Sequence, residues 1–165
     1  MSRAFVKEDD QEEAPFIPPR APLPENETNY VTAAGKKALI QEKSQLEEEK
    51  TSVKFIEKEA DRRRALATLN GKMKLLESRI NSARVLTAEE QPQDEVRFGA
   101  KVQFTMNGKV QFFQIVGVDE ANVKDQKIAF TAPIAKALMG KKVGAKPQLM
   151  LGKEGRSIEI LAIDY

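Results

Sequence analysis

Residues 66–83 read LATLNGKMKLLESRINSA, and the spacing of apolar residues in this stretch decides the fold of the first half of the chain. Apolar side chains recur every three or four positions, at Leu66, Leu69, Met73, Leu76, Ile80 and Ala83. This is the period of one apolar stripe on an α-helix, and charged residues fill the opposite faces. Because a helix with a single stripe must cover it, the sequence predicts a second helix packed alongside.

The residues before this helix carry a matching stripe, at Leu39, Leu46, Val53, Ile56 and Ala60. Thr32 is expected to cap the first helix, because a threonine side chain there accepts an otherwise unpaired backbone N–H. Two single-stripe helices in succession predict an antiparallel coiled-coil hairpin over residues 30–86. The symmetry of the stripes places its turn near residues 57–62. Gly71 inside the second helix weakens that helix by ~1 kcal/mol relative to alanine.

Residues 1–29 precede the hairpin and form an acidic, proline-rich leader, with five prolines between Ala14 and Pro24. Proline lacks a backbone N–H and fixes φ, so neither a helix nor a sheet can run through this stretch. The sequence therefore predicts an extended and disordered leader. Phe16 and Ile17 could bind a partner there, or the leader could be a solvated tail without a site.

After a polar linker at residues 87–95, the apolar pattern changes from helical to alternating, which is typical of β-strands. Asn107-Gly108 indicates a tight two-residue hairpin turn. Pro133 and Gly140 are expected to begin and end one short helix. Strands are expected at about residues 96–104, 110–116, 128–130, 148–151 and 157–163. The sequence thus predicts an α+β fold, in which the hairpin precedes an antiparallel β domain over residues 96–165.

Histidine and cysteine are both absent. Their absence excludes disulfides, a thiolate nucleophile and a cysteine-based zinc site, and it removes the commonest general base. Any metal would have to be a hard cation such as Mg²⁺, bound by Asp or Glu oxygens. We therefore expect neither an enzyme in its own right nor a cofactor of its own. Without a long apolar run or a secretory signal pattern, a monomeric cytoplasmic protein with no membrane contact is expected.

The net charge of +2 is unevenly distributed along the chain. Residues 1–30 contain three basic and seven acidic residues, whereas from Arg97 onward eleven basic residues stand against six acidic ones. A basic C-terminal part favours an anionic partner, such as nucleic acid or an acidic protein surface. An ordinary solvated, lysine-rich surface is the alternative interpretation.

Four blocks of the C-terminal half resemble the bacterial Gre transcript-cleavage factors in order and spacing, and they cover residues 98–100, 115–120, 132–141 and 159–165. The start at Tyr30 to Gly35 and the end of the second helix at residues 80–86 are also similar to that family. The resemblance implies a coiled-coil hairpin joined to an FKBP-like domain. It also implies docking at the secondary channel of bacterial RNA polymerase, which the hairpin would enter.

The same resemblance implies a docking surface. Its residues would be Asp119, Glu120, Ala132, Pro133 and Ile134. The family usually has a serine where Ala132 stands, so this chain lacks one hydroxyl at that surface.

In the Gre family, two acidic residues at the hairpin tip help to hold a magnesium ion at the polymerase active site, where backtracked RNA is hydrolysed. The family's acidic tip motif is absent here. The candidates in its place are Glu57, Glu59 and Asp61, and three arginines that would pair with them follow at once. Compared with a typical Gre hairpin, this one lacks about one heptad per arm, which shortens its reach by roughly 10 Å.

The short hairpin and the missing motif together favour a polymerase-binding regulator without efficient cleavage activity. An active cleavage-stimulating factor is the alternative, and the polymerase would then supply the Mg²⁺. A prolyl isomerase of the FKBP type would need an aromatic-lined cavity, whereas the phenylalanines are expected in the core, at Phe98, Phe104, Phe112, Phe113 and Phe130. Direct DNA binding through the lysine-rich face would show a steep salt dependence.

Overall fold

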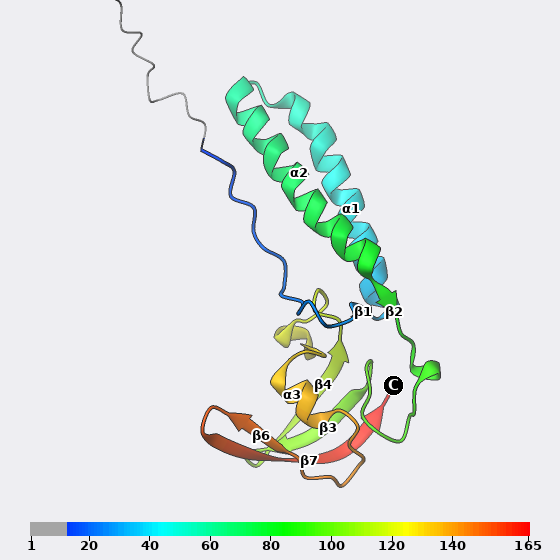
Figure 1. The fold of residues 1–165 in the computed structure, drawn as a ribbon. Coiled ribbons are helices and arrows are strands. Elements are labelled where there is room, and N and C mark those ends of the chain that lie inside the picture. The colour runs from blue at the N-terminus through cyan, green and yellow to red at the C-terminus, as the bar shows by residue number, and fades with distance from the viewer. Residues whose placement is uncertain (1–12) are drawn as a thin grey trace, which may run out of the picture.

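A computed structural model describes residues 13–165, which form a helical hairpin standing on a β domain (Figure 1). The hairpin consists of α1 (Ala33–Ser52) and α2 (Glu59–Ser82), joined through the single 3₁₀ turn η2 (Val53–Phe55). At its base, β1 (Tyr30–Val31) and β2 (Arg84–Val85) pair in parallel. The predicted coiled-coil hairpin is therefore confirmed. Within the described residues, no helix is long and apolar enough to cross a membrane.

The local sequence explains where each helix of the hairpin begins. The Thr32 hydroxyl oxygen accepts a hydrogen bond from the Gly35 backbone N–H at 2.9 Å, which confirms the predicted cap. The turn begins at Val53 and ends at Lys58, a few residues earlier than the stripes suggest. Acidic side chains are stabilised at the positive end of a helix, which suits the first turn of α2, where Glu59 lies.

The apolar stripes of the two helices meet in a separate small core. Its buried members are Val31, Leu39, Leu46, Val53, Leu69, Met73 and Leu76. Leu76 is completely buried, whereas its neighbour Leu75 is 38% exposed. Leu66, which the sequence places on the stripe, lies at its margin and is 39% exposed.

The β domain contains one five-stranded sheet with strand order β5-β4-β3-β7-β6. The strands are β3 (Lys101–Met106), β4 (Lys109–Val116), β5 (Lys127–Ala129), β6 (Gln148–Leu151) and β7 (Glu154–Asp164). The short helix α3 (Pro133–Leu138) begins at Pro133, as predicted. Two short 3₁₀ turns lie outside the sheet: η3 (Ala88–Glu90) is in the linker, and η4 (Val123–Asp125) precedes β5. Asn107 and Gly108 both have positive φ, as the predicted tight turn requires.

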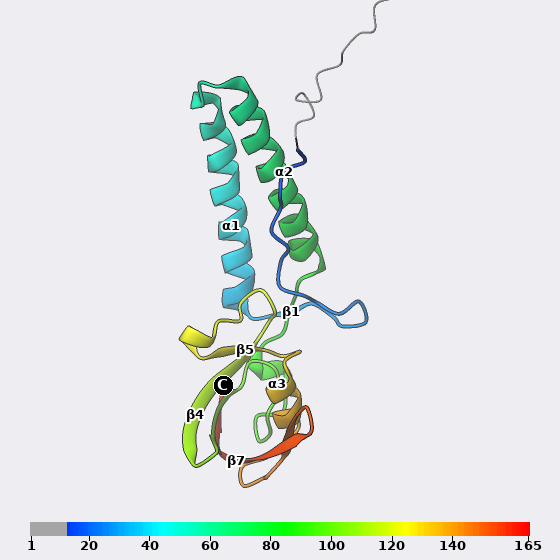
Figure 2. The ribbon, with the colours of Figure 1, turned by 90° about the vertical axis from the view of Figure 1, so that its left-hand side faces the viewer.

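The α+β fold class is confirmed, with one difference in strand direction. In the five-stranded sheet, β4 and β5 pair in parallel, while the other neighbouring strands are antiparallel. The expectation of a wholly antiparallel sheet is therefore wrong for β5. Alternation of apolar residues identifies a strand but not its direction, so it could not predict that the connection through η4 returns the chain parallel to β4. A register shift between Gln103 and Phe104 bends the pairing of β3 with β7, and Figure 2 shows the resulting curled sheet.

The hairpin base contributes to the core of the β domain. The ring of Tyr30 lies 6.0 Å from that of Phe98 and 6.0 Å from that of Phe130, measured between centroids. Phe104 is also buried, as predicted, and Phe113 stacks on it. Phe112 is half exposed instead, because side chains alternate along β4 and Phe113 takes the inner face.

The last residue holds the linker against the β domain. The Tyr165 hydroxyl accepts a hydrogen bond from the Arg97 N–H at 2.9 Å and donates one to the Glu95 carbonyl at 2.6 Å. Burial raises the pKa of Tyr165, in keeping with a phenol that stays protonated and donates.

The leader takes a defined path over its described part. Residues 13–29 run extended beside α2 down to the hairpin base, as both views show (Figures 1 and 2). The extended conformation agrees with the proline content. The expectation of disorder does not describe residues 13–29, because Ile17 and Arg20 contact the hairpin and the β domain. For residues 1–12 that expectation lies outside the described residues.

Substituting Leu76 by alanine tests the hairpin core. We expect the free energy of unfolding to fall by about 2–5 kcal/mol, because the substitution leaves a cavity in a fully buried site. Leu75→Ala is the matched control and should cost less than about 1 kcal/mol, since Leu75 is partly exposed. Urea denaturation followed by circular dichroism measures both values. Equal losses for the two variants would contradict this assignment of the stripe.

Candidate functional site

The hairpin tip lies at the end of the hairpin remote from the β domain (Figure 1). Of the predicted tip candidates, Glu57 lies in the turn, while Glu59 and Asp61 lie in the first turn of α2. All three are exposed. Residues two apart on a helix do not face each other, so the carboxylates of Glu59 and Asp61 do not converge on a common point. Within residues 13–165, no cluster of three or more acidic side chains is arranged to hold a metal ion.

The arginines that follow the tip are used in different ways. Arg63 forms an ion pair with Glu59, with a distance of 3.4 Å between Nη1 and Oε1. Arg62 instead donates to the backbone carbonyl of Ile56 at 3.3 Å, which closes the turn. Glu57 has no ion pair within the described part of the chain. Of the predicted pairs between arginines and tip acids, the structure therefore supports the one between Arg63 and Glu59.

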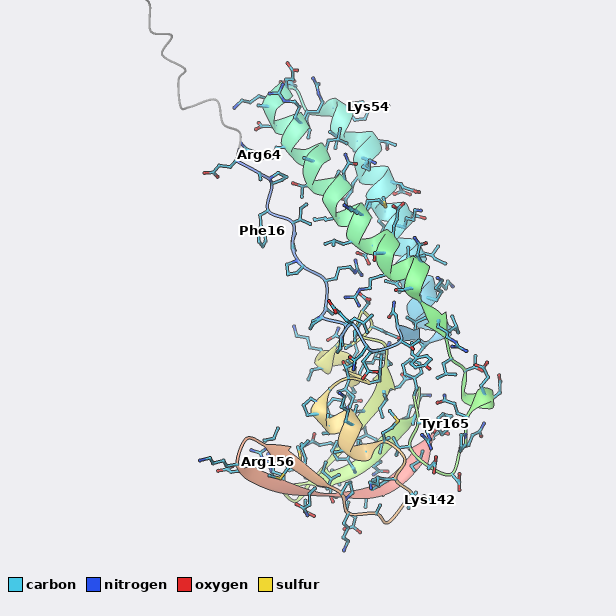
Figure 3. The ribbon with its side chains drawn as sticks, in the orientation of Figure 1. Phe16, Lys54, Arg64, Lys142, Arg156 and Tyr165 are labelled. Carbon is cyan, nitrogen blue, oxygen red and sulfur yellow. The ribbon has the colours of Figure 1, made fainter. Side chains whose placement is uncertain are left out.

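The tip also presents an aromatic ring that the sequence analysis missed. Phe55 is 76% exposed, and the Lys54 ammonium lies 5.1 Å from the centroid of its ring. Figure 3 shows Lys54 and Arg64 at this end of the hairpin. Residues 50–64 contain six basic and three acidic residues, so the tip has a net positive charge. A large aromatic residue between the stripe positions Val53 and Ile56 was the available signal.

The first part of the predicted docking surface lies in the turn after β4, and its side chains face inward. The Asp119 side chain is 7% exposed, and its Oδ1 accepts a hydrogen bond from Arg20 Nε at 2.8 Å. The Arg79 guanidinium approaches from α2, with Nη1 at 3.3 Å from Asp119 Oδ2. Neither of these two buried atoms makes a hydrogen bond, so this second contact is an ion pair only. Asp119 is therefore enclosed by arginines of the leader and the hairpin.

Glu120 is held in the same way. Its side chain is 11% exposed, accepts a hydrogen bond from the Thr32 hydroxyl at 2.5 Å and pairs with Lys127 at 3.4 Å. The helix start must approach closely for this contact, and a Cβ on Gly35 would lie 2.7 Å from Glu120 Oε2. Similarly, a Cβ on Gly117 would lie 2.6 Å from the Tyr30 carbonyl. The two glycines thus allow the hairpin base to sit tightly on the turn after β4.

The second part of the predicted docking surface follows β5. Ala132 precedes α3, Pro133 is exposed as its first residue, and Ile134 is half-buried. Because β4 and β5 are parallel, the segments after both strands leave the sheet at the same edge, and the Phe130 N–H donates to the Val116 carbonyl at 2.9 Å. The structure therefore brings all five docking candidates to one edge beside the hairpin base.

The docking candidates and the tip candidates form two separate groups. α2 alone contains 24 residues, which at 1.5 Å per residue corresponds to roughly 36 Å. The protein thus has one end with an exposed, cationic tip and another end where a sheet edge meets the hairpin. Sequence reasoning assigned Asp119 and Glu120 to a partner surface and missed their contacts with Arg20, Arg79 and Thr32. Those contacts join segments far apart in the sequence, and no local pattern indicates them.

Replacing Asp119 with alanine tests its internal role. We expect a loss of about 2–3 kcal/mol in the free energy of unfolding, because the largely buried Arg79 would lose its carboxylate partner and Arg20 would lose one of its two. Asp164→Ala serves as the control, since Asp164 is exposed on β7. Thermal and urea denaturation give the comparison. If both variants were equally stable, Asp119 would not be what holds the leader and the hairpin on the β domain.

Comparison with known proteins supports a single family. Residues 91–165 match the family described as transcription elongation factor GreA/GreB, C-terminal. Transcription elongation factor GreA of Acidiphilium cryptum (strain JF-5) is 37% identical over 99 residues, which cover 59% of this chain and 63% of that protein. GreA of Methylococcus capsulatus (strain Bath) is 33% identical over 100 residues, with the same coverage. The chain thus spans less than two thirds of the length of these relatives.

Among solved structures, GreA factor homolog 1 of Thermus thermophilus is similar over 84% of this chain and 100% of that chain, at 22% sequence identity. The TM-score of 0.37 is too low for any argument to rest on this likeness.

Proposed function

We propose that the chain, whose C-terminal domain matches the GreA/GreB family of transcription elongation factors, is a Gre-family factor that binds bacterial RNA polymerase and regulates elongation without efficient transcript cleavage. In this proposal it acts in the cytoplasm, the β domain docks at the rim of the secondary channel, and the hairpin enters the channel. The observation that carries the proposal is the hairpin tip, where a cationic, aromatic surface occupies the place at which cleavage requires paired carboxylates.

Docking would use the edge formed by the ends of β4 and β5. Pro133 is the exposed residue of this edge, with Ala132 and Ile134 beside it. Asp119 and Glu120 support the edge from within, because their carboxylates are bound by the leader and the hairpin. Their contribution to polymerase binding would therefore be to fix the shape of the docking edge.

Several features of the tip oppose stimulation of cleavage. A magnesium ion requires oxygen ligands that converge within tenths of an ångström. Glu59 forms an ion pair with Arg63, and Asp61, two positions further along the helix, does not share a face with Glu59. The six basic residues among residues 50–64 further oppose the approach of another cation. In this proposal any Mg²⁺ is the polymerase's own, and the tip does not help to hold it.

Length supports the same conclusion. α1 contains 20 residues and therefore extends for roughly 30 Å from the base. The shortfall of about one heptad per arm relative to typical Gre hairpins would leave the tip roughly 10 Å short of the catalytic metal. A hairpin of this length can occupy the channel without reaching the reaction.

A stalled, backtracked elongation complex provides the test. With purified protein and Mg²⁺ at neutral pH, we expect no shortening of the transcript beyond that seen with polymerase alone. Added in excess over a GreA factor, the protein should protect the transcript from cleavage, because both would compete for the channel. Pro133→Asp should abolish this protection, and Lys153→Asp, an exposed change in the turn between β6 and β7, should leave it intact.

Shortened transcripts would instead support an active cleavage factor. The exposed position of Glu57 favours this second possibility, because its carboxylate has no ion pair among the described residues. In that case Glu57→Gln should remove the activity, and the length argument would be wrong.

A further inference from the structure

We infer that the leader is a strap, defined here as residues 15–23, which fixes the orientation of the hairpin on the β domain and in which Arg20 is a positioning residue. The strap lies outside residues 91–165, the part that matches the GreA/GreB family. Its effect on polymerase binding rests on the proposed function, whereas its effect on the shape of the protein does not.

Arg20 contacts both halves of the molecule at once. Its guanidinium donates from Nη1 and Nη2 to the two carboxylate oxygens of Glu42 on α1, at 2.8 and 3.0 Å. Its Nε donates to Asp119 of the β domain at 2.8 Å. The Arg20 side chain is 18% exposed, and the hydrogen bond to Glu42 is the main cause that raises its pKa above the ordinary value. The planar guanidinium provides the rigid fork that such a double contact needs, which a lysine could not reproduce.

The second helix joins the same cluster. Arg79 of α2 pairs with Asp119 and also donates from Nη2 to the backbone carbonyl of Ala21 in the strap. Asp119 is therefore shared between an arginine of the strap and an arginine of the hairpin. Because α1, α2, the strap and the turn after β4 all meet here, movement of the hairpin would break several charged contacts together.

A second anchor explains the glycine inside α2. A Cβ on Gly71 would lie 1.9 Å from Ile17 Cδ1 and 2.7 Å from Ile17 Cγ1. Gly71 thus forms a notch that receives the Ile17 side chain, and packing of Ile17 offsets the ~1 kcal/mol that glycine costs a helix. Leu23, at the other end of the strap, packs against the core of the β domain. The strap is anchored on α2 at one end and on the β domain at the other, with Arg20 between them.

The geometry makes this positioning consequential. The hairpin is joined covalently to the rest of the chain only through its base, next to β1 and β2, and its length makes it a lever. A pivot of about 10° at the base would move a tip that lies roughly 36 Å away by roughly 6 Å. A displacement of that size is comparable to the width of a side chain, so the strap would decide where the tip lies in a channel.

The absence of cysteine allows a direct measurement in the full-length chain. Spin labels are attached at Lys58→Cys in the tip and Lys109→Cys at the start of β4, both exposed positions. Double electron–electron resonance (DEER) spectroscopy then gives the distribution of distances between the two labels. We expect one narrow distribution in the doubly labelled parent, and a clearly broadened or two-peaked one after Arg20→Ala or Gly71→Leu.

The two variants and their controls separate positioning from folding. Gly71→Leu replaces glycine with a strong helix former, so it should expel Ile17 while stabilising α2. Ile17→Ala should broaden the distribution as well, whereas Phe16→Ala should not, because the Phe16 ring is 80% exposed and projects from the leader (Figure 3). Circular dichroism checks that helix content is retained. Unchanged distributions in both Arg20→Ala and Gly71→Leu would overturn the strap.

Competition with a GreA factor in the backtracked complex tests the consequence for polymerase. If the productive orientation falls to about a tenth of the population, protection should need roughly tenfold more protein. If the distance distributions broaden in the strap variants but the parent protein fails to protect the transcript, the strap is supported and the proposed function is rejected. If the parent protects and both strap variants protect equally well, the strap has no effect on polymerase binding, and that part of the inference is overturned.

Discussion

The carboxylate of Asp119 is the point on which the arrangement of this protein depends. It lies in the turn after β4, nearly out of contact with solvent, and arginines from the leader and from α2 approach it. A buried charge of this kind is tolerable only when it is paired, so the three segments must arrive together for any of them to be stable there. Glu120 repeats this arrangement one residue later, with the hydroxyl that also caps α1. Together with the packing of Tyr30 in the β-domain core, these two adjacent acidic residues fix the relative placement of the hairpin and the β domain.

This arrangement links the docking edge of the β domain to the distant hairpin tip. The exposed Pro133 edge lies beside the joint, and the cationic tip is a full helix length away. For a partner bound at this edge, the position of the tip would therefore depend on how rigidly the hairpin base is held on the turn after β4. The same residues that stabilise the fold would then determine how well the tip is aimed.

Local patterns were sufficient for the elements and insufficient for their assembly. The stripe from Leu69 to Leu76, the Thr32 cap, the Asn107-Gly108 turn and the start of α3 at Pro133 are each determined by residues close in sequence, and each is confirmed. The parallel direction of β5 and the inward orientation of Asp119 depend on contacts between distant segments, so no local spacing predicts them. Glycine is unfavourable inside a helix, and the structural reason for Gly71 lies more than fifty residues earlier in the sequence, at Ile17.

The strand order of the sheet carries a consequence of its own. The two edges are formed by β5, with three residues, and β6, with four, whereas the long β7 lies inside between β3 and β6. An exposed strand edge offers unpaired backbone groups to any other chain, and short edges limit how many such groups are available. However, β5 pairs with β4 only along Gln114–Val116, and β6 with the residues just before it pairs with β7 only as far as Ile160. The outer backbone of β4 from Lys109 to Phe113 has no partner in β5, so this stretch is where a strand of another molecule could add to the sheet.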